Sequence, residues 1–123
     1  MTERPTHRLL IDESPLQFQR GLAVGIGVNE AIFLQQLHYW LMRSKNERSG
    51  MWWVYNTLDA WQREFPFWSI PTIRRIIAKL EDMGIVLSTA EHNASWANRT
   101  KWYTIDYDRL ADYDKGRYAE SVG

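Results

Sequence analysis

The residues around Pro66 constrain the fold more than any other part of this sequence. Proline lacks a backbone N–H and restricts the residue before it, so a helix over Thr57 to Phe65 has to end there. A second helix follows closely, because Ser69 is a good N-cap and Pro71 is tolerated in a first turn. Each helix has one apolar face, formed by Leu58, Trp61 and Phe65 in the first and by Ile73, Ile76, Ile77, Leu80 and Met83 in the second. We therefore predict a short helix, a tight turn and a longer helix up to Gly84.

A longer helix and a strand precede this pair. Asn29 can cap a helix that extends to about Ser44. Its apolar stripe comprises Ile32, Phe33, Leu34, Leu37, Trp40 and Leu41. The aromatic run Met51 to Tyr55 is bounded by turn-forming residues, which is typical of a strand. The polar stretch from Arg43 to Gly50 is predicted to be a loop within the domain.

Two further patterns lie near the N-terminus. Ser14 followed by Pro15 is a helix-opening signal and predicts a short helix, which Gly25 and Gly27 end. The apolar run Leu9 to Ile11 predicts a small edge strand before that helix.

The C-terminal third has the pattern of a hairpin. Two β-rich runs, Ile85 to Thr89 and Lys101 to Ile105, flank the polar stretch from Ala90 to Thr100, and a last helical turn starts near Arg109. Helix, helix, strand, short helix, turn, helix and hairpin is the order of a winged helix-turn-helix, an α+β fold that is mainly α with a small sheet. We expect one winged-helix domain over residues 1–123, with flexible ends at about 1–8 and 115–123.

Length and composition limit the cellular compartments in which we expect this protein. The chain has 123 residues, a size typical of one domain. No apolar run reaches the ~18 residues of a membrane span, and no cleavable apolar signal is present. We therefore expect a cytoplasmic protein without a membrane partner.

Catalytic interpretations find little support in the sequence. The chain has no cysteine, which excludes disulfides, thiolate zinc sites and a thiol nucleophile. His7, His38 and His92 lie in different predicted elements without metal-ligand spacing or a paired acid nearby in sequence. We expect no enzyme, no metal and no cofactor.

The helix after the turn carries a local positive charge although the formal net charge of the chain is zero. No acidic residue lies between Ser69 and Leu80, and helical spacing directs Arg75 away from the apolar stripe. Such a helix can enter a DNA major groove and contact base edges and phosphates. Arg75 is the best candidate to contact bases, and Ser69 serves mainly as the cap. The predicted DNA-binding residues of this helix are Ser69, Thr72, Arg74, Arg75 and Lys79. The alternative is a charged helix surface that only faces solvent.

The stretch between the two hairpin strands is the predicted wing. Arg99 and Lys101 are expected to contact phosphates across the minor groove. Trp96 can pack on sugars, on a second subunit or on the domain itself, the last being the commoner arrangement. Trp68, in the turn, either clamps the two helices together or lies near the nucleic acid, and we favour the clamp.

Four stretches of the sequence resemble a known family. These are Ile11 to Leu16, Gly27 to Trp40, Trp53 to Thr57, and Trp61 to Ser69 with the Phe-Pro-Phe-Trp-Ser turn. Together they resemble the N-terminal winged-helix domain of phage and plasmid replication proteins, the replisome-organiser or DnaD-like proteins, over about Leu9 to Tyr107. The resemblance implies a DNA-binding, often self-associating domain that marks an origin and helps to recruit the replicative helicase machinery.

Our leading hypothesis is a double-stranded DNA-binding protein of phage or plasmid replication initiation. The expected partners are double-stranded DNA, further copies of the chain, and helicase or helicase-loader proteins. Self-association is expected because Phe18, Trp52 and Trp96 exceed what one small core can cover. Two alternatives stay open: a transcriptional regulator, and a protein-interaction or oligomerisation module of a replisome, which zero net charge and the aromatic content favour.

Overall fold

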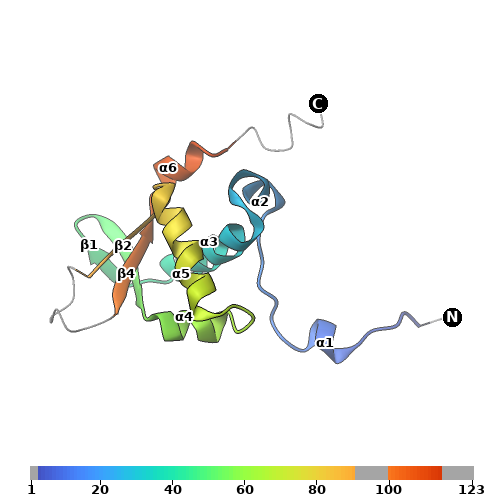
Figure 1. Ribbon diagram of the computed structural model, residues 1–123. Coiled ribbons are helices and arrows are strands. Elements are labelled where there is room, and N and C mark those ends of the chain that lie inside the picture. Colours follow the sequence, from blue (N-terminus) through green and yellow to red (C-terminus); the bar gives the residue numbers. More distant parts are fainter. Residues whose placement is uncertain (1–2, 91–99, 115–123) are drawn as a thin grey trace.

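The computed structural model describes residues 3–90 and 100–114. Its described part is an α+β fold with six helices and a four-stranded antiparallel sheet (Figure 1). In chain order the elements are α1 (Arg8–Ile11), α2 (Arg20–Ile26), α3 (Val28–Leu41), β1 (Asn46–Arg48), β2 (Met51–Asn56), α4 (Leu58–Glu64), α5 (Ile70–Asp82), β3 (Val86–Thr89), β4 (Lys101–Ile105) and α6 (Tyr107–Ala111).

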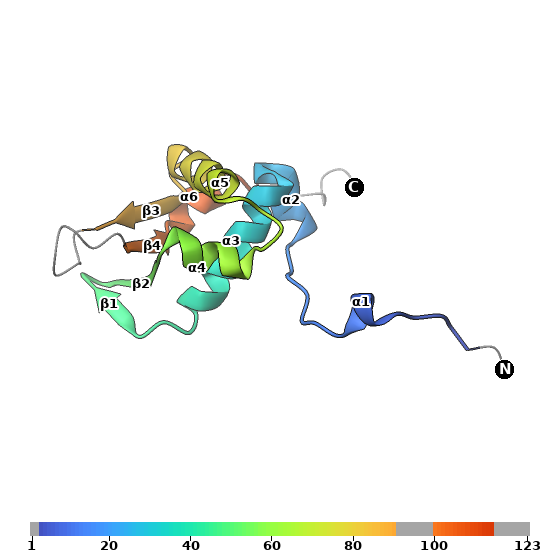
Figure 2. The ribbon, with the colours of Figure 1, turned by 60° about the horizontal axis from the view of Figure 1, so that its bottom comes forward.

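The sheet has the strand order β1-β2-β4-β3, so β2 and β4 are its central strands (Figure 2). Val54 of β2 lies opposite Tyr103 of β4, and Ile105 of β4 lies opposite Val86 of β3. These four side chains belong to the hydrophobic core or pack against it. Helices α3 and α5 cover this face of the sheet.

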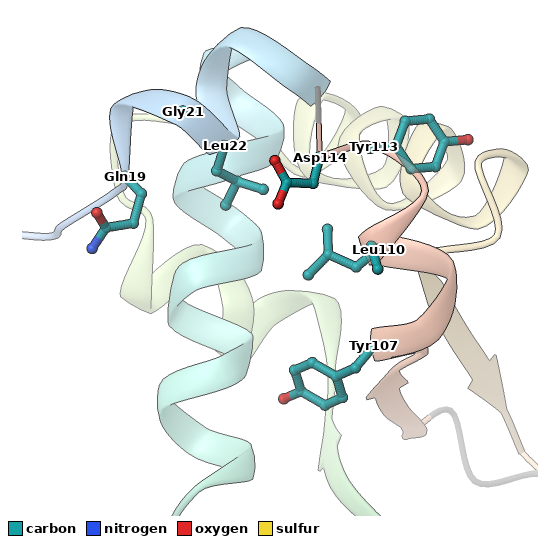
Figure 3. Close-up of a pocket in the computed structure, with 8 residues that line it drawn as sticks. Gln19, Gly21, Leu22, Tyr107, Leu110, Tyr113 and Asp114 are labelled. Atoms are coloured by element: carbon teal, nitrogen blue, oxygen red, sulfur yellow. The ribbon is translucent and has the colours of Figure 1, made fainter. Parts of the chain in front are cut away.

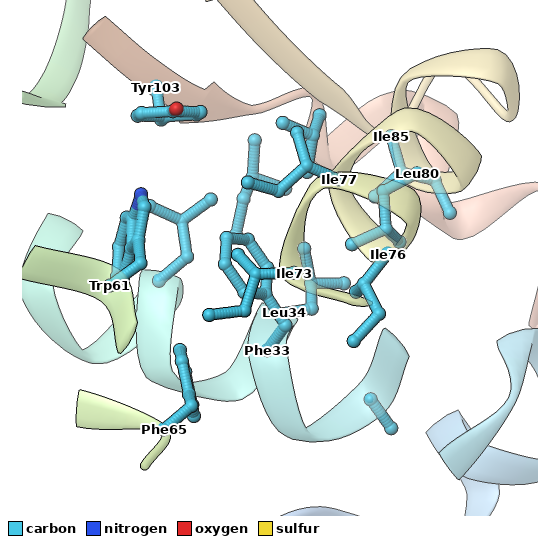
Figure 4. Packing of buried hydrophobic residues seen from close by; sticks show 14 of the residues in the cluster. Phe33, Leu34, Trp61, Phe65, Ile73, Ile76, Ile77, Leu80, Ile85 and Tyr103 are labelled. Atoms are coloured by element: carbon cyan, nitrogen blue, oxygen red, sulfur yellow. The ribbon is translucent and has the colours of Figure 1, made fainter. Parts of the chain in front are cut away.

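Aromatic rings form the centre of the core (Figure 4). The Phe33 ring of α3 lies 5.0 Å from Trp61 and 5.7 Å from Phe65, measured between centroids. Trp61 also meets the edge of the Tyr103 ring at 5.7 Å. Burial raises the pKa of the Tyr103 hydroxyl to about 12. Rings from α3, α4 and β4 thus join the helices to the sheet.

The predicted pair of helices is confirmed. Thr57 Oγ1 accepts a hydrogen bond from the Ala60 N–H and starts α4, and Ser69 Oγ accepts from the Thr72 N–H and starts α5. Trp68 is buried with its ring 4.9 Å from that of Phe65, so it clamps the turn as favoured from the sequence. The long helix, the strand after it, the hairpin strands and the last helical turn also occur where they were predicted.

The loop predicted between α3 and β2 is wrong in part, because it contains strand β1. Ser49 and Gly50 have φ values of 54° and 80°, the left-handed backbone of a two-residue hairpin turn. Arg48 therefore pairs with Met51, and the Glu47 carboxylate accepts a hydrogen bond from the Gly50 N–H at 2.9 Å. The Ser-Gly dipeptide is the signal that identifies this turn.

Two N-terminal predictions are wrong. The run Leu9 to Ile11 belongs to the four-residue helix α1, which His7 caps, and it is not part of the four-stranded sheet that the structure describes. The helix predicted from Ser14 starts only at Arg20. The residues before Arg20 are non-helical from Ser14 onward, and Leu16 among them packs against the core.

The predicted N-cap of α3 is also wrong. Asn29 lies inside the helix, and Gly27 takes the cap position with a φ of 106°. Gly27 is the single residue between α2 and α3, and its positive φ, which glycine adopts at little cost, lets the two helices follow each other directly.

Candidate nucleic-acid interface

Helix α5 has the two-sided character that its sequence predicts. Its buried side chains are Ile73, Ile76, Ile77 and Leu80. Pro71, Arg74, Arg75, Ala78 and Lys79 are exposed on the remaining surface. The apolar stripe holds the helix on α3, α4 and β3, so the basic residues face away from the core.

A chain of hydroxyl contacts places the Arg75 side chain at the start of α5. The hydroxyl oxygens of Ser69 and Thr72 lie 3.0 Å apart, and Arg75 Nη2 donates to Thr72 Oγ1 at 3.3 Å. Within residues 3–90 and 100–114, Arg75 forms no ion pair. Its guanidinium therefore keeps most of its five donors for another molecule.

Lys79 is held differently from Arg75. Its Nζ lies 3.3 Å from Oε1 of Glu30, whose side chain is only 12% exposed in the first turn of α3. This ion pair connects the start of α3 to α5. No local sequence pattern indicates this ion pair, because Glu30 lies 49 residues away along the chain. A phosphate has to compete with Glu30 for the ammonium group.

Arg74 and Lys101 border one hollow on the other side of α5. Its volume is about 200 Å³, and Leu58, Ala78, Glu81 and Tyr103 also line it. The structure thus brings together two cations that are 27 positions apart in the sequence. Glu81, whose carboxylate accepts a hydrogen bond from Ser88 Oγ, places one negative charge at the same hollow.

Charge along α5 changes sign from its first half to its end. Arg74 and Arg75 precede Glu81 and Asp82, which stand in the last turn together with Lys79, the cation that pairs with Glu30. Carboxylates at a helix C-terminus oppose the macrodipole, so helix stability does not account for this order. The positive end of α5 is the one beside the turn.

The wing prediction is only partly covered by the structure. Arg99, Trp96 and His92 lie outside the described residues. Lys101 is exposed at the first position of β4 and pairs across the sheet with Asn56 of β2. Of the seven predicted DNA contacts, six are therefore placed: Ser69, Thr72, Arg74, Arg75 and Lys79 at the start of α5 or on it, and Lys101 on β4.

The described residues contain no group of three potential metal-binding side chains among His, Asp and Glu. The Nδ1 atom of His38 lies 2.8 Å from the Tyr107 hydroxyl, joining α3 to α6. Burial raises the pKa of the Tyr107 hydroxyl. Among these residues, no helix has the length and apolar character that crossing a membrane requires.

Comparisons with known proteins add no assignment: no protein-family model matches the chain, and no curated protein and no solved structure matches it.

Proposed function

We propose that this chain is a winged-helix protein that binds double-stranded DNA, with α5 in the major groove and the stretch between β3 and β4 beside it as the wing. Phage or plasmid replication initiation is the favoured setting, on the sequence resemblance alone, and transcriptional control is the alternative. In this proposal the protein acts in the cytoplasm without catalysis. It associates with further copies of itself and with helicase or helicase-loader proteins.

The order of elements supports the winged-helix part of the proposal. A helix (α3), a strand (β2), a helix-turn-helix pair (α4 and α5) and a hairpin (β3 and β4) follow one another, and β2 pairs with β4. Within residues 3–90 and 100–114, this arrangement leaves the outer surface of α5 exposed. A helix presented in this way fits the width of the major groove.

The DNA-binding proposal rests mainly on the exposure and the hydrogen-bond partner of Arg75. Its side chain is exposed in the middle of the outer surface of α5 and is held by the Thr72 hydroxyl rather than by a carboxylate. An exposed guanidinium at this place, without a carboxylate partner among the described residues, is suited to bidentate contact with guanine.

The test is a fluorescence-anisotropy titration of duplex DNA over a range of salt concentrations. We expect binding that weakens steeply with salt, and Arg74→Gln should reduce the salt slope by about 0.9 if this residue meets one phosphate. Arg63→Gln is the matched control, because Arg63 is exposed on α4 outside the proposed surface. Absence of binding to long duplex DNA at low salt would refute the proposal.

A protein-interaction module is the second candidate, and exposed aromatic side chains favour it. Trp52 and Tyr55 of β2 and Phe67 of the turn are each more than half exposed. Aromatic residues are enriched in protein interfaces. If the chain binds no DNA but associates with a helicase or its loader, this candidate replaces the first.

A further inference from the structure

The face of the sheet opposite α3 and α5 exposes an aromatic ring on a central strand. Helices α3 and α5 pack on the side of Val54 and Tyr103, and side chains alternate along a strand, so Tyr55 and Trp102 point to the other side. These two residues lie directly opposite each other on β2 and β4. Tyr55 is 57% exposed, and its ring lies 5.0 Å from that of Trp102, which is only 8% exposed. A buried ring thus supports an exposed one.

A cation lies beside the two rings. Arg48 of β1 pairs with Met51, and its guanidinium lies over the Trp102 ring, 5.6 Å from the ring centroid. Within residues 3–90 and 100–114, Arg48 forms no ion pair with a carboxylate. We call Arg48, Tyr55 and Trp102 the outer aromatic cluster, because together they present a flat ring and a positive charge on the same face.

The charge around the outer aromatic cluster suits a polyanion. In the four described strands the one acidic residue is Glu47, which lies opposite Trp52 on the other face and whose carboxylate accepts a hydrogen bond from the Gly50 N–H. The sequence from Arg43 to Asn56 carries three basic residues and one acidic residue, and the sequence from Ala90 to Lys101 carries two basic residues and one acidic residue. Both stretches are therefore net positive.

The apolar groove between α2 and α6 does not offer this combination (Figure 3). Its volume is about 360 Å³, and Leu22, Tyr107 and Leu110 line it. Asp114 also lines the groove, and a carboxylate there repels a chain of phosphates. The outer aromatic cluster is therefore the better candidate for a second nucleic-acid site.

We propose that the outer aromatic cluster binds single-stranded nucleic acid, with a base stacked on Tyr55 and a phosphate paired with Arg48. Every base has a flat face, so a tyrosine ring accepts bases of any sequence, and single strands are commonly held in this way. A base within a duplex is covered on both faces by its neighbours, so the cluster selects single strands. The proposal is independent of duplex binding, because it uses no residue of α5.

The first test is fluorescence anisotropy with a labelled oligothymidylate of about 20 nucleotides. Tyr55→Thr should weaken binding at least about fivefold, because it removes the stacking surface, whereas Tyr55→Phe keeps the ring and should bind like the wild type. Trp52→Thr is the matched control, since Trp52 is 51% exposed on the same strand but faces the other side. Absence of binding at low salt, or equal weakening by Tyr55→Thr and Trp52→Thr, would overturn the proposal.

The salt dependence of oligothymidylate binding tests the phosphate contact. Arg48→Gln should make the salt slope shallower by about 0.7, the value for one phosphate of a single strand. Because Arg48 is exposed, this variant keeps the fold even if Tyr55→Thr does not. Arg43→Gln is the control with an unchanged slope, since the Arg43 guanidinium lies over the Tyr39 ring of α3 at 3.7 Å. An unchanged slope in Arg48→Gln would contradict the proposal.

Arg75→Ala separates this proposal from duplex binding by α5. It should relax the preference among duplexes and leave oligothymidylate binding unchanged, whereas loss of oligothymidylate binding would place the single strand on α5 and overturn the proposal. Oligouridylate of the same length distinguishes RNA from DNA: binding of either supports the cluster, and the tighter one identifies the type of strand. If Tyr55→Thr leaves both oligonucleotides bound but disrupts association with a protein, this face is a protein interface and the proposal is wrong.

Discussion

Helices α3 and α5 are similar in length, yet they differ in how the rest of the chain uses them. Helix α3 packs against α2, α5, β2 and β4, and its buried positions include Phe33, Leu34 and Leu37. Helix α5 buries one stripe, and its basic surface is exposed in the part of the chain that the structure describes. The difference separates two roles: the buried side chains of α3 determine stability, whereas the exposed outer surface of α5 contributes little to it and is the surface that we propose for DNA binding.

The largest effect is expected in α3. Phe33→Ala should lower the free energy of unfolding by about 3–5 kcal/mol, because the ring is fully buried between Trp61 and Phe65. Urea denaturation followed by tryptophan fluorescence measures this loss. A change below about 1 kcal/mol would contradict the central place of α3 in the core.

Alkaline pH should destabilise the contact between α4 and the sheet. The pKa of Tyr103 is about 12 in the folded chain against 10.0 normally, so between these values the unfolded chain has released a proton that the folded chain retains. Stability is therefore lost as pH rises through this window, by up to about 2–3 kcal/mol. Tyr103→Phe should remove this part of the pH dependence in urea titrations, and an unchanged profile would count against it.

Gly27→Ala tests the junction between α2 and α3. A Cβ atom there would clash with Glu30 Oε1 in a backbone with positive φ, so we expect the free energy of unfolding to fall by about 1–3 kcal/mol. Gly50→Ala is the control, because its φ is also positive but its Cβ meets nothing within 4 Å. Equal losses in thermal unfolding would show that the carboxylate has no part in the effect.

Arg75→Ala tests whether the outer surface of α5 serves DNA binding rather than stability. The free energy of unfolding should change by less than about 0.5 kcal/mol, because the side chain is exposed. Preference among duplex sequences, measured by selection and sequencing of bound DNA, should relax by about 1–3 kcal/mol. A clear loss of stability with unchanged preference would assign Arg75 to the fold instead.

The smallest effect concerns the ion pair that connects the two helices. Glu30→Gln releases Lys79 from its carboxylate, so DNA binding should strengthen and the salt slope should become steeper by up to about 0.9. Adding Lys79→Gln should cancel the gain. If Glu30→Gln leaves the slope unchanged, Lys79 does not meet a phosphate.

The sequence predicted the elements that local chemistry determines. Ser69, Pro71 and the isoleucine stripe defined α5, and Thr57 and Pro66 defined α4, because caps and breakers act within a few residues. The outward direction of Arg75 followed from helical spacing in the same way.

One prediction failed, and some contacts were missed, where tertiary packing rather than local sequence determines the structure. Ser14-Pro15 has the local chemistry of a helix start, yet the packing of Leu16 on the core coincides with a non-helical segment there. The pairing of Lys79 with Glu30 and the position of Arg74 and Lys101 at one hollow were not predicted, because they depend on how distant segments pack. Local patterns carry no information about such contacts.

The most direct test of DNA recognition by α5 is an NMR titration of the labelled chain with a short duplex, following the backbone amides. Our account predicts that the largest shifts lie between Ser69 and Lys79 and at Lys101, while the amides of α6 stay in place. Shifts centred on α6 or on β1, with those of α5 unchanged, would contradict it.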